Sequence, residues 1–246
     1  MDCLPAADEV DALGRRVDAD DNVQGVLLTG SYAHGMATPD CDIDLQVILA
    51  ERDERWMSGP FGPLDVHVVD ADGFRRVPVH PANWWDRYRI GRGRLLLDRT
   101  DGSLAADHRR WSALSAVEQA DAVDYYLDPY LTYTMRSLHE ARHGEAQASR
   151  LDAAEAIPWA LRLVFAIRGR VRPTNRYLAW ELEHHPLDVP GLSGSRLSAL
   201  LEDMLADGSP AAQRELFADL EPRLRAQGFG GALEGYPKAM QLLHAG

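Results

Sequence analysis

Three aspartates in the first third of the chain have the spacing of a metal site. Asp42 and Asp44 are separated by one residue, and Asp65 lies in a later apolar stretch. Two neighbouring carboxylates repel each other and raise each other's pKa unless a cation lies between them. A hard divalent cation such as Mg²⁺ binds carboxylate oxygens and completes its coordination shell with substrate phosphates. The pattern therefore predicts a magnesium site that acts on a phosphate compound.

A Gly-Ser pair precedes these aspartates and provides groups that can hold a phosphate. Gly30 and Ser31 follow the apolar run VQGVLLT, and ten residues separate Ser31 from Asp42. A turn at this point presents backbone N–H groups, and Ser31 adds a hydroxyl, which together suit phosphate oxygens. We expect the turn to lie beside the aspartates.

The elements that must position these residues are predicted to be strands. Residues 23–29 form one buried strand, and residues 41–50 (CDIDLQVILA) form a second. Because side chains alternate along a strand, both aspartates of the second strand share one face and its apolar residues share the other. The same alternation in residues 64–69 (LDVHVV) places Asp65 and His67 together. One face of the sheet is thus predicted to carry carboxylates.

The pattern Gly-Ser, ten residues, Asp-x-Asp resembles the signature of the nucleotidyltransferase superfamily, which includes DNA polymerase beta and the antibiotic nucleotidyltransferases. The resemblance implies transfer of a nucleoside monophosphate from a nucleoside triphosphate, with ATP the expected donor, to an acceptor hydroxyl. It implies that Asp42 and Asp44 hold one Mg²⁺. Asp65 would join them around a second Mg²⁺ and activate the hydroxyl. Gly30 and Ser31 would hold the terminal phosphates.

Cationic side chains for the triphosphate are expected near the start of a later helix. Residues 168–180 (RGRVRPTNRYLAW) resemble the segment of small-molecule nucleotidyltransferases in which a basic residue reaches the phosphates. Arg176 falls at that position and Arg172 is a second candidate, since a guanidinium can bind phosphate through two hydrogen bonds. An arginine-rich helix end that faces water is the open alternative. Four other arginines are predicted to lie in a solvated loop: Arg87, Arg89, Arg92 and Arg94.

Two further roles stay open at this stage. His34 is predicted to be a turn residue near solvent. If Asp65 is not the general base, the sequence does not choose among four other carboxylates: Asp86, Glu118, Asp124 and Asp128.

Composition limits the possible functions. The 246 residues carry a formal charge of −12, which argues against a protein that binds nucleic acid, because neutralising phosphates requires a basic surface. Cys3 and Cys41 are the two cysteines, which excludes a disulfide framework and a cysteine-based zinc site. No apolar run has the length of a membrane span. We expect a cytoplasmic protein, and the oligomeric state is left open.

The chain is predicted to be α+β, with a mixed-sheet nucleotidyltransferase domain over residues 1–112 and an all-α bundle over residues 113–246. The first domain is expected to contain these further elements: a helix in residues 5–20, a hairpin-like loop at 51–63, a helix at 83–90, a strand at 95–98, and a helix that Ser103 caps and that runs through Trp111. Seven helices are expected in the second: 115–126, 130–143, 150–168, 175–184, 194–206, 210–226 and 231–243.

This two-domain plan resembles the aminoglycoside and lincosamide nucleotidyltransferases and implies a small hydroxylated acceptor that the helical domain binds. A second hypothesis has the same fold but a different function: an antitoxin-like enzyme that modifies a protein, or an inactive module that binds a partner. The long helical part favours the first hypothesis, a small-molecule acceptor. A remote alternative is a zinc metalloprotease, because His139, Glu140 and His143 match the motif H-E-x-x-H.

Overall fold

The chain folds as two compact units in a computed structural model, residues 1–113 and residues 114–246. The structure describes residues 6–58 and 61–245. Cys3 lies outside these ranges, as do Gly59 and Pro60 of the predicted hairpin-like loop. No helix among the described residues combines the length and the apolar composition that crossing a membrane requires.

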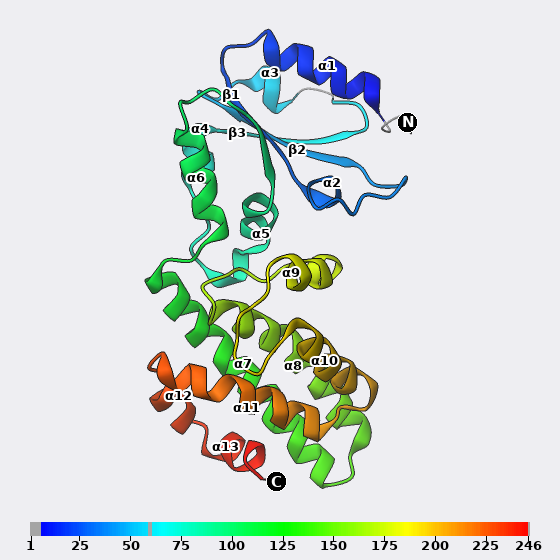
Figure 1. The fold of residues 1–246 in the computed structure, drawn as a ribbon, viewed down its shortest axis with the longest axis vertical. Coiled ribbons are helices and arrows are strands. Elements are labelled where there is room, and N and C mark those ends of the chain that lie inside the picture. Colours follow the sequence, from blue (N-terminus) through cyan, green and yellow to red (C-terminus); the bar gives the residue numbers. More distant parts are fainter. Residues whose placement is uncertain (1–5, 59–60, 246) are drawn as a thin grey trace. The chain divides into compact units, whose positions relative to one another are not determined.

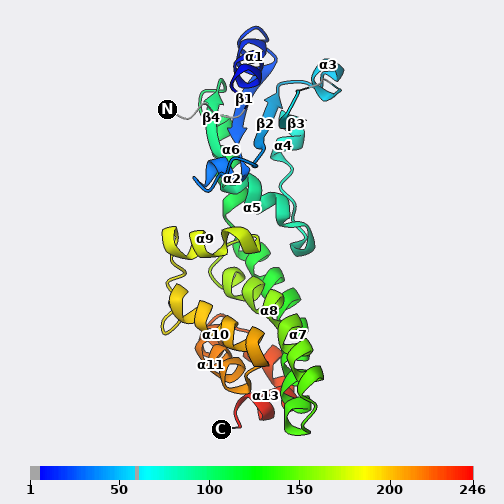
Figure 2. The same cartoon turned by 90° about the vertical axis from the view of Figure 1, so that its right-hand side faces the viewer.

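The first unit is built around a four-stranded mixed sheet. Its strands are β1 (Val23–Leu28), β2 (Ile43–Leu49), β3 (Leu64–Asp70) and β4 (Arg94–Asp98). Figure 2 shows them in the spatial order β3-β2-β1-β4. β1 pairs antiparallel with both β2 and β4, whereas β2 and β3 pair parallel. The mixed sheet followed by helices confirms the predicted α+β class.

Helices cover both faces of this sheet (Figure 1). On one face, α1 (Ala7–Asp18) and α3 (Glu54–Met57) pack against the apolar side chains of β2, with Leu13, Val17 and Trp56 in the shared core. On the other face lie α4 (Ala71–Arg75), α5 (Trp85–Gly91) and α6 (Ser103–Ser112). Their residues in the core there include Phe74 and Trp111. The side chains of β2 therefore alternate between the two faces. Ile43, Leu45, Val47 and Leu49 belong to one core and Ile48 to the other, whereas the sequence pattern predicts a core on one face alone.

Two predictions for this unit are wrong in detail. Residues 51–63 do not form a hairpin-like loop, because β3 returns parallel to β2 and parallel strands need a long crossover, which here includes α3. Ser103 does not cap α6, since the helix begins at Ser103 itself. Thr100 satisfies the first turn instead, with its hydroxyl accepting from the N–H of Leu104 at 2.8 Å.

The second unit is entirely helical. α7 (Ala116–Arg142) and α8 (Ala146–Ala166) lie side by side (Figures 1 and 2). The remaining helices are α9 (Leu178–His184), α10 (Gly194–Asp207), α11 (Pro210–Ala226), α12 (Gly230–Glu234) and α13 (Pro237–Leu243). Short 3-10 turns precede α5 and α9, at Pro81–Asn83 and Asn175–Tyr177.

Prolines lie at the two places where the number of helices differs from the prediction. Elsewhere the bounds shift, since the helix predicted at 150–168 spans 146–166. Two helices were expected around Pro129, yet α7 continues through it, since buried residues on both sides of the proline, among them Leu127 and Leu131, belong to one packed face. Packing of that face outweighs the hydrogen bond that proline cannot donate. Conversely, the single helix expected at 231–243 is divided, and α13 begins at Pro237.

Candidate active site

The three predicted metal-binding aspartates lie together at one end of the sheet. Asp42 directly precedes β2, and Asp44 and Asp65 are the second residues of β2 and β3. The parallel register places Asp44 directly opposite Asp65. One carboxylate oxygen from each of the three aspartates lies within 4.8 Å of the others. The structure therefore brings together three carboxylates where β2 and β3 begin.

The environment of these carboxylates differs from one to the next. Asp42 and Asp65 are exposed, whereas Asp44 is partly buried. Burial raises the pKa of Asp44 above its usual value, and the charges of Asp42 and Asp65 add to this increase. His67 lies beside the group, with its Nε2 3.6 Å from Asp65 Oδ1. The group thus accumulates negative charge that a cation would relieve.

A divalent cation fits this donor set. Carboxylate oxygens are the hard ligands that Mg²⁺ prefers, and three of them leave coordination positions for substrate oxygens. A metal ion needs about three His, Cys, Asp or Glu side chains close together. Among the described residues, such a group is formed by Asp42, Asp44 and Asp65. His139, Glu140 and His143 do not belong to such a group. His139 and His143 are exposed and Glu140 is partly buried. The three gain no further ligand among the described residues, which removes the structural basis of the zinc alternative.

The turn at Gly30 lies against Asp44. Gly30 has a φ of +61°, and a Cβ added to it would lie 1.8 Å from Asp44 Oδ2. Thr29, just before it, donates its N–H to the Asp44 carbonyl at 2.8 Å. Ser31 follows in the short helix α2 (Gly30–Ala33) and is buried. The expected neighbourhood of the Gly-Ser turn and the aspartates is therefore observed.

His34 is not the solvent-facing turn residue that the sequence predicts. It is only 6% exposed. Its ring Nδ1 lies 2.7 Å from the Gly30 carbonyl oxygen, and Nε2 lies 3.3 Å from the hydroxyl of Tyr88 on α5. The prediction fails because a partner 54 residues away in sequence covers the turn. His34 therefore connects the Gly30 turn to α5.

Of the arginines predicted to be solvated, one is instead buried and a second is partly buried. Arg87 is fully buried and donates to backbone carbonyls, among them Ala113 at 2.7 Å and Arg110 at 3.2 Å. The side chain of Arg89 is 14% exposed and lies on the face of the sheet that carries Asp44. The sequence offers the helical period of residues 83–90 as a signal, but it gives no sign of which partners the two side chains meet. Arg89 is a site residue that sequence reasoning missed.

Comparison with known proteins identifies this unit. The family described as "Nucleotidyltransferase domain" matches residues 10–96, a range that includes the Gly30 turn and all three aspartates. Residues 10–96 therefore form a nucleotidyltransferase domain. This confirms the predicted superfamily and, at that level, an enzyme of nucleotidyl transfer. The match to the nucleotidyltransferase domain ends before the helical unit begins.

Other comparisons add little about this nucleotidyltransferase. No curated protein sequence matches the chain. Among solved structures, a nucleotidyltransferase-like protein from Exiguobacterium sibiricum is 16% identical, with a TM-score of 0.47. The alignment covers 93% of this chain and 78% of that one.

The two arginines predicted to bind nucleotide belong to the helical unit of the nucleotidyltransferase. Arg172 donates to the side-chain oxygen of Asn175, and its Nε is a buried nitrogen without a hydrogen-bond partner. Burial, with the nearby charge of Arg162, lowers the pKa of the Arg172 guanidinium to about 10. Arg176 is exposed. A partly buried guanidinium next to a second cation suits an anionic ligand, and the nucleotide role of both residues stays a prediction.

The four alternative general bases differ in how they are engaged. Glu118 accepts from the Ser115 N–H at 2.8 Å in the capping box of α7, which gives it a structural role. Asp128 accepts from the hydroxyl of Tyr236 and raises the pKa of that tyrosine to about 12. Asp86 accepts from Arg89 at 3.3 Å, and Asp124 is exposed on α7. Of the five candidates, only Asp65 belongs to the group of three carboxylates.

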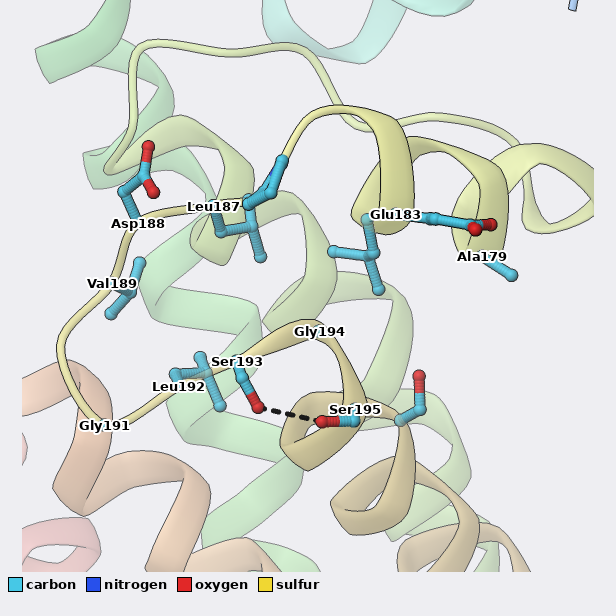
Figure 3. A pocket seen from close by; sticks show the side chains of 13 residues that line it. Ala179, Glu183, Leu187, Asp188, Val189, Gly191, Leu192, Ser193, Gly194 and Ser195 are labelled. Carbon is cyan, nitrogen blue, oxygen red and sulfur yellow. Dashed lines mark hydrogen bonds between the residues drawn. The ribbon is translucent and has the colours of Figure 1, made fainter.

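The helical unit of the nucleotidyltransferase also contains a pocket of about 700 Å³ between α9 and the beginning of α10 (Figure 3). Its volume is in the range of small-molecule sites. Leu187, Val189 and Leu192 contribute buried apolar side chains to its wall. The polar lining consists of carboxylates and hydroxyls, from Glu183, Asp188, Ser193, Ser195 and Ser198. Among the described residues that line it, none is Lys, Arg or His.

Proposed function

We propose that the protein transfers a nucleoside monophosphate from a nucleoside triphosphate, with ATP the expected donor, to a hydroxyl group of a small-molecule acceptor. The observation that carries this proposal is the grouping of Asp42, Asp44 and Asp65 within 4.8 Å beside the Gly30 turn, inside a segment that matches the nucleotidyltransferase domain family. Phosphoryl-type transfers depend mainly on positioning and charge neutralisation, which this arrangement can supply.

Each carboxylate has a separate part in this proposal. Asp42 and Asp44 would hold the first Mg²⁺, and Asp65 would share a second with them. Bound there, Mg²⁺ supplies positive charge to the attacking and leaving oxygens. Asp65 is 49% exposed at its side chain, so an acceptor hydroxyl can reach it from solvent and give up its proton to it. Asp44 is the partly buried one of the three, and the backbone at Thr29 and Gly30 lies against it.

Binding of the triphosphate is assigned to two sets of groups. The backbone N–H groups at the turn after Gly30, with the Ser31 hydroxyl, would hold the terminal phosphates. Arg172 and Arg176 of the helical unit would add positive charge. The unpartnered, buried Nε of Arg172 supports a role in anion binding for that residue.

The acceptor is proposed to be a cationic, hydroxyl-rich small molecule such as an aminoglycoside-like compound; a lincosamide-like compound is the second candidate of the same class. The pocket between α9 and α10 supports this class, because its polar lining holds two carboxylates and three hydroxyls over an apolar wall. Opposite charge and complementary hydrogen-bonding groups favour such a ligand. The net charge of −12 attracts cationic molecules in general.

The test is a pyrophosphate-release assay with the four ribonucleoside triphosphates, Mg²⁺ and a panel of cationic hydroxylated acceptors. We expect release with at least one pair. Asp42→Asn and Asp44→Asn should reduce it by more than about a hundredfold, because loss of a metal ligand exceeds the effect of outer-shell changes. Asp21→Asn serves as the control, since this exposed carboxylate lies before the start of β1, away from the Gly30 turn that follows its end. Unchanged activity in either site variant contradicts the assignment of the site.

A second measurement addresses the acceptor alone. Glu183→Gln should weaken acceptor binding and leave the affinity for the triphosphate unchanged, as measured by calorimetry. A triphosphate that binds with Mg²⁺ in the absence of turnover on any small molecule would favour the protein-modifying reading. No triphosphate binding at all would favour an inactive, partner-binding domain.

A further inference from the structure

Arg89 lies on the same face of the sheet as the acidic group. Its Nη1 donates to Thr29 Oγ1 at 3.4 Å, and its Nη2 donates to Gln46 Oε1 at 3.3 Å. Thr29 also donates its N–H to the carbonyl of Asp44. Gln46 is two residues beyond Asp44 on β2, so the two side chains share one face. The guanidinium is therefore held next to Asp44 by residues on either side of that carboxylate.

The charge of Arg89 is not cancelled by its acidic partner. Asp86 accepts from Nε and Nη2 at 3.3 Å, but its side chain is 54% exposed, so water screens its charge. The side chain of Arg89 is only 14% exposed. Burial raises the pKa of Asp44 and the charge of Arg89 lowers it, which agrees with the geometry. A mostly buried cation thus acts on the half-buried carboxylate of the group.

We propose that Arg89 is a built-in counter-cation of the metal site. It compensates part of the charge of the three carboxylates, and its positive charge opposes the entry of a divalent cation. Tight metal binding then requires the additional negative charge of a nucleoside triphosphate, so that each of the two ligands increases the affinity for the other. This inference rests on the proposed function, and it gives Arg89 a positioning and electrostatic role rather than contact with the substrate.

Loss of the Arg89 charge should strengthen metal binding, whereas loss of a residue that only supports the site would weaken it. Removing the charge in Arg89→Met should tighten Mn²⁺ binding in the absence of nucleotide by on the order of tenfold, because the Coulomb repulsion is lost. Arg89→Lys keeps the charge and should stay within about twofold of the wild type. The dependence of Mn²⁺ affinity on added triphosphate should be smaller in Arg89→Met than in the wild type. Mn²⁺ affinity is measured by calorimetry and by electron paramagnetic resonance of the free ion.

Arg109→Met is the matched control, because Arg109 is an exposed arginine of α6 in the same unit and the charge change is the same. Its Mn²⁺ affinity should equal that of the wild type. A purely structural role for Arg89 would lower the melting temperature in both substitutions at this position and would weaken metal binding. Mn²⁺ affinity that is unchanged or weaker in a folded Arg89→Met protein overturns the inference.

The wild-type titration separates this result from failure of the proposed function. If the wild type binds Mn²⁺ and Asp44→Asn does not, the metal site stands and the Arg89 comparison decides the inference alone. If the wild type and Asp44→Asn bind Mn²⁺ equally weakly even with added triphosphate, the proposed metal site is wrong, and the inference falls with it.

Discussion

Substituting Gly30 by alanine should weaken metal binding as well as destabilise the fold. The residue has a φ of +61°, where an L-residue costs about 1–2 kcal/mol. The new Cβ would lie 1.8 Å from Asp44 Oδ2 and 2.7 Å from its Cγ. The oxygen must therefore move by roughly 1.2 Å to reach even the 3.0 Å below which real contacts essentially never occur. Metal ligands tolerate displacements of only about 0.2 Å, so Asp44 should lose its place in the site.

Gly35→Ala is the control that separates backbone strain at positive φ from the collision of a new Cβ with Asp44. Gly35 lies shortly after the same turn and has a φ of +68°, but nothing lies within 4 Å of the Cβ that it would gain. Both substitutions should lower the free energy of unfolding by about 1–2 kcal/mol through the backbone alone. Gly30→Ala should lower it by about 1 kcal/mol more and weaken Mn²⁺ binding by at least about tenfold, because its collision falls on a metal ligand.

Urea unfolding followed by circular dichroism, and Mn²⁺ titration of the folded proteins, measure the two quantities. The reasoning is refuted if both alanine variants lose the same stability and both bind Mn²⁺ like the wild type. That outcome would mean that Asp44 can move without loss, so that the close approach of Gly30 is not what positions it.

Two further predictions concern the supports of the site. Arg87→Met should lower the free energy of unfolding by about 3–5 kcal/mol in urea, because buried backbone carbonyls lose a charged donor; a loss below about 1 kcal/mol would contradict this. Asp98→Asn should cost about 1 kcal/mol at pH 7. Burial raises the pKa of Asp98, but hydrogen bonds from Thr100 and Ala105 outweigh it and the net pKa is lowered, so this stability is present above the unfolded pKa and is lost as the pH falls through the folded one. Thermal unfolding of the wild type and of Asp98→Asn between pH 7 and pH 2.5 should show that their difference in stability disappears at the acidic end. A difference that is constant with pH would refute this prediction.

The strands and the acidic group could be predicted because their signals are local. A strand's side chains alternate with a period of two, so the sequence alone fixes that Asp65 and His67 share a face. The Gly-Ser spacing then indicates that the aspartates and the turn belong to one site. α11 was predicted with its observed bounds because Ser209 and Pro210 give a clear start, with the Ser209 hydroxyl accepting from the Ala212 N–H at 3.3 Å.

The remaining features depend on partners that are distant in sequence. His34 and Tyr88 are 54 residues apart, and Arg89 and Thr29 are 60 apart, so neither contact has a local pattern. The continuity of α7 through Pro129 likewise follows from tertiary packing rather than from propensity. In each case the sequence identifies a residue able to do chemistry or to break a helix, and the fold decides whether it does.

The parallel register of β2 and β3 has a consequence for folding accuracy. Asp44 faces Asp65, and carboxylates that repel each other cannot select this alignment by themselves. If β3 slipped by one residue, Leu64 or Val66 would take the place of Asp65, and the carboxylate would turn toward the core beneath α1. Burial of the apolar side chains that alternate with the acidic residues therefore selects the register of the two strands during folding. Because the carboxylates do not set this register, they can be substituted during evolution while the two strands still pair in the same register.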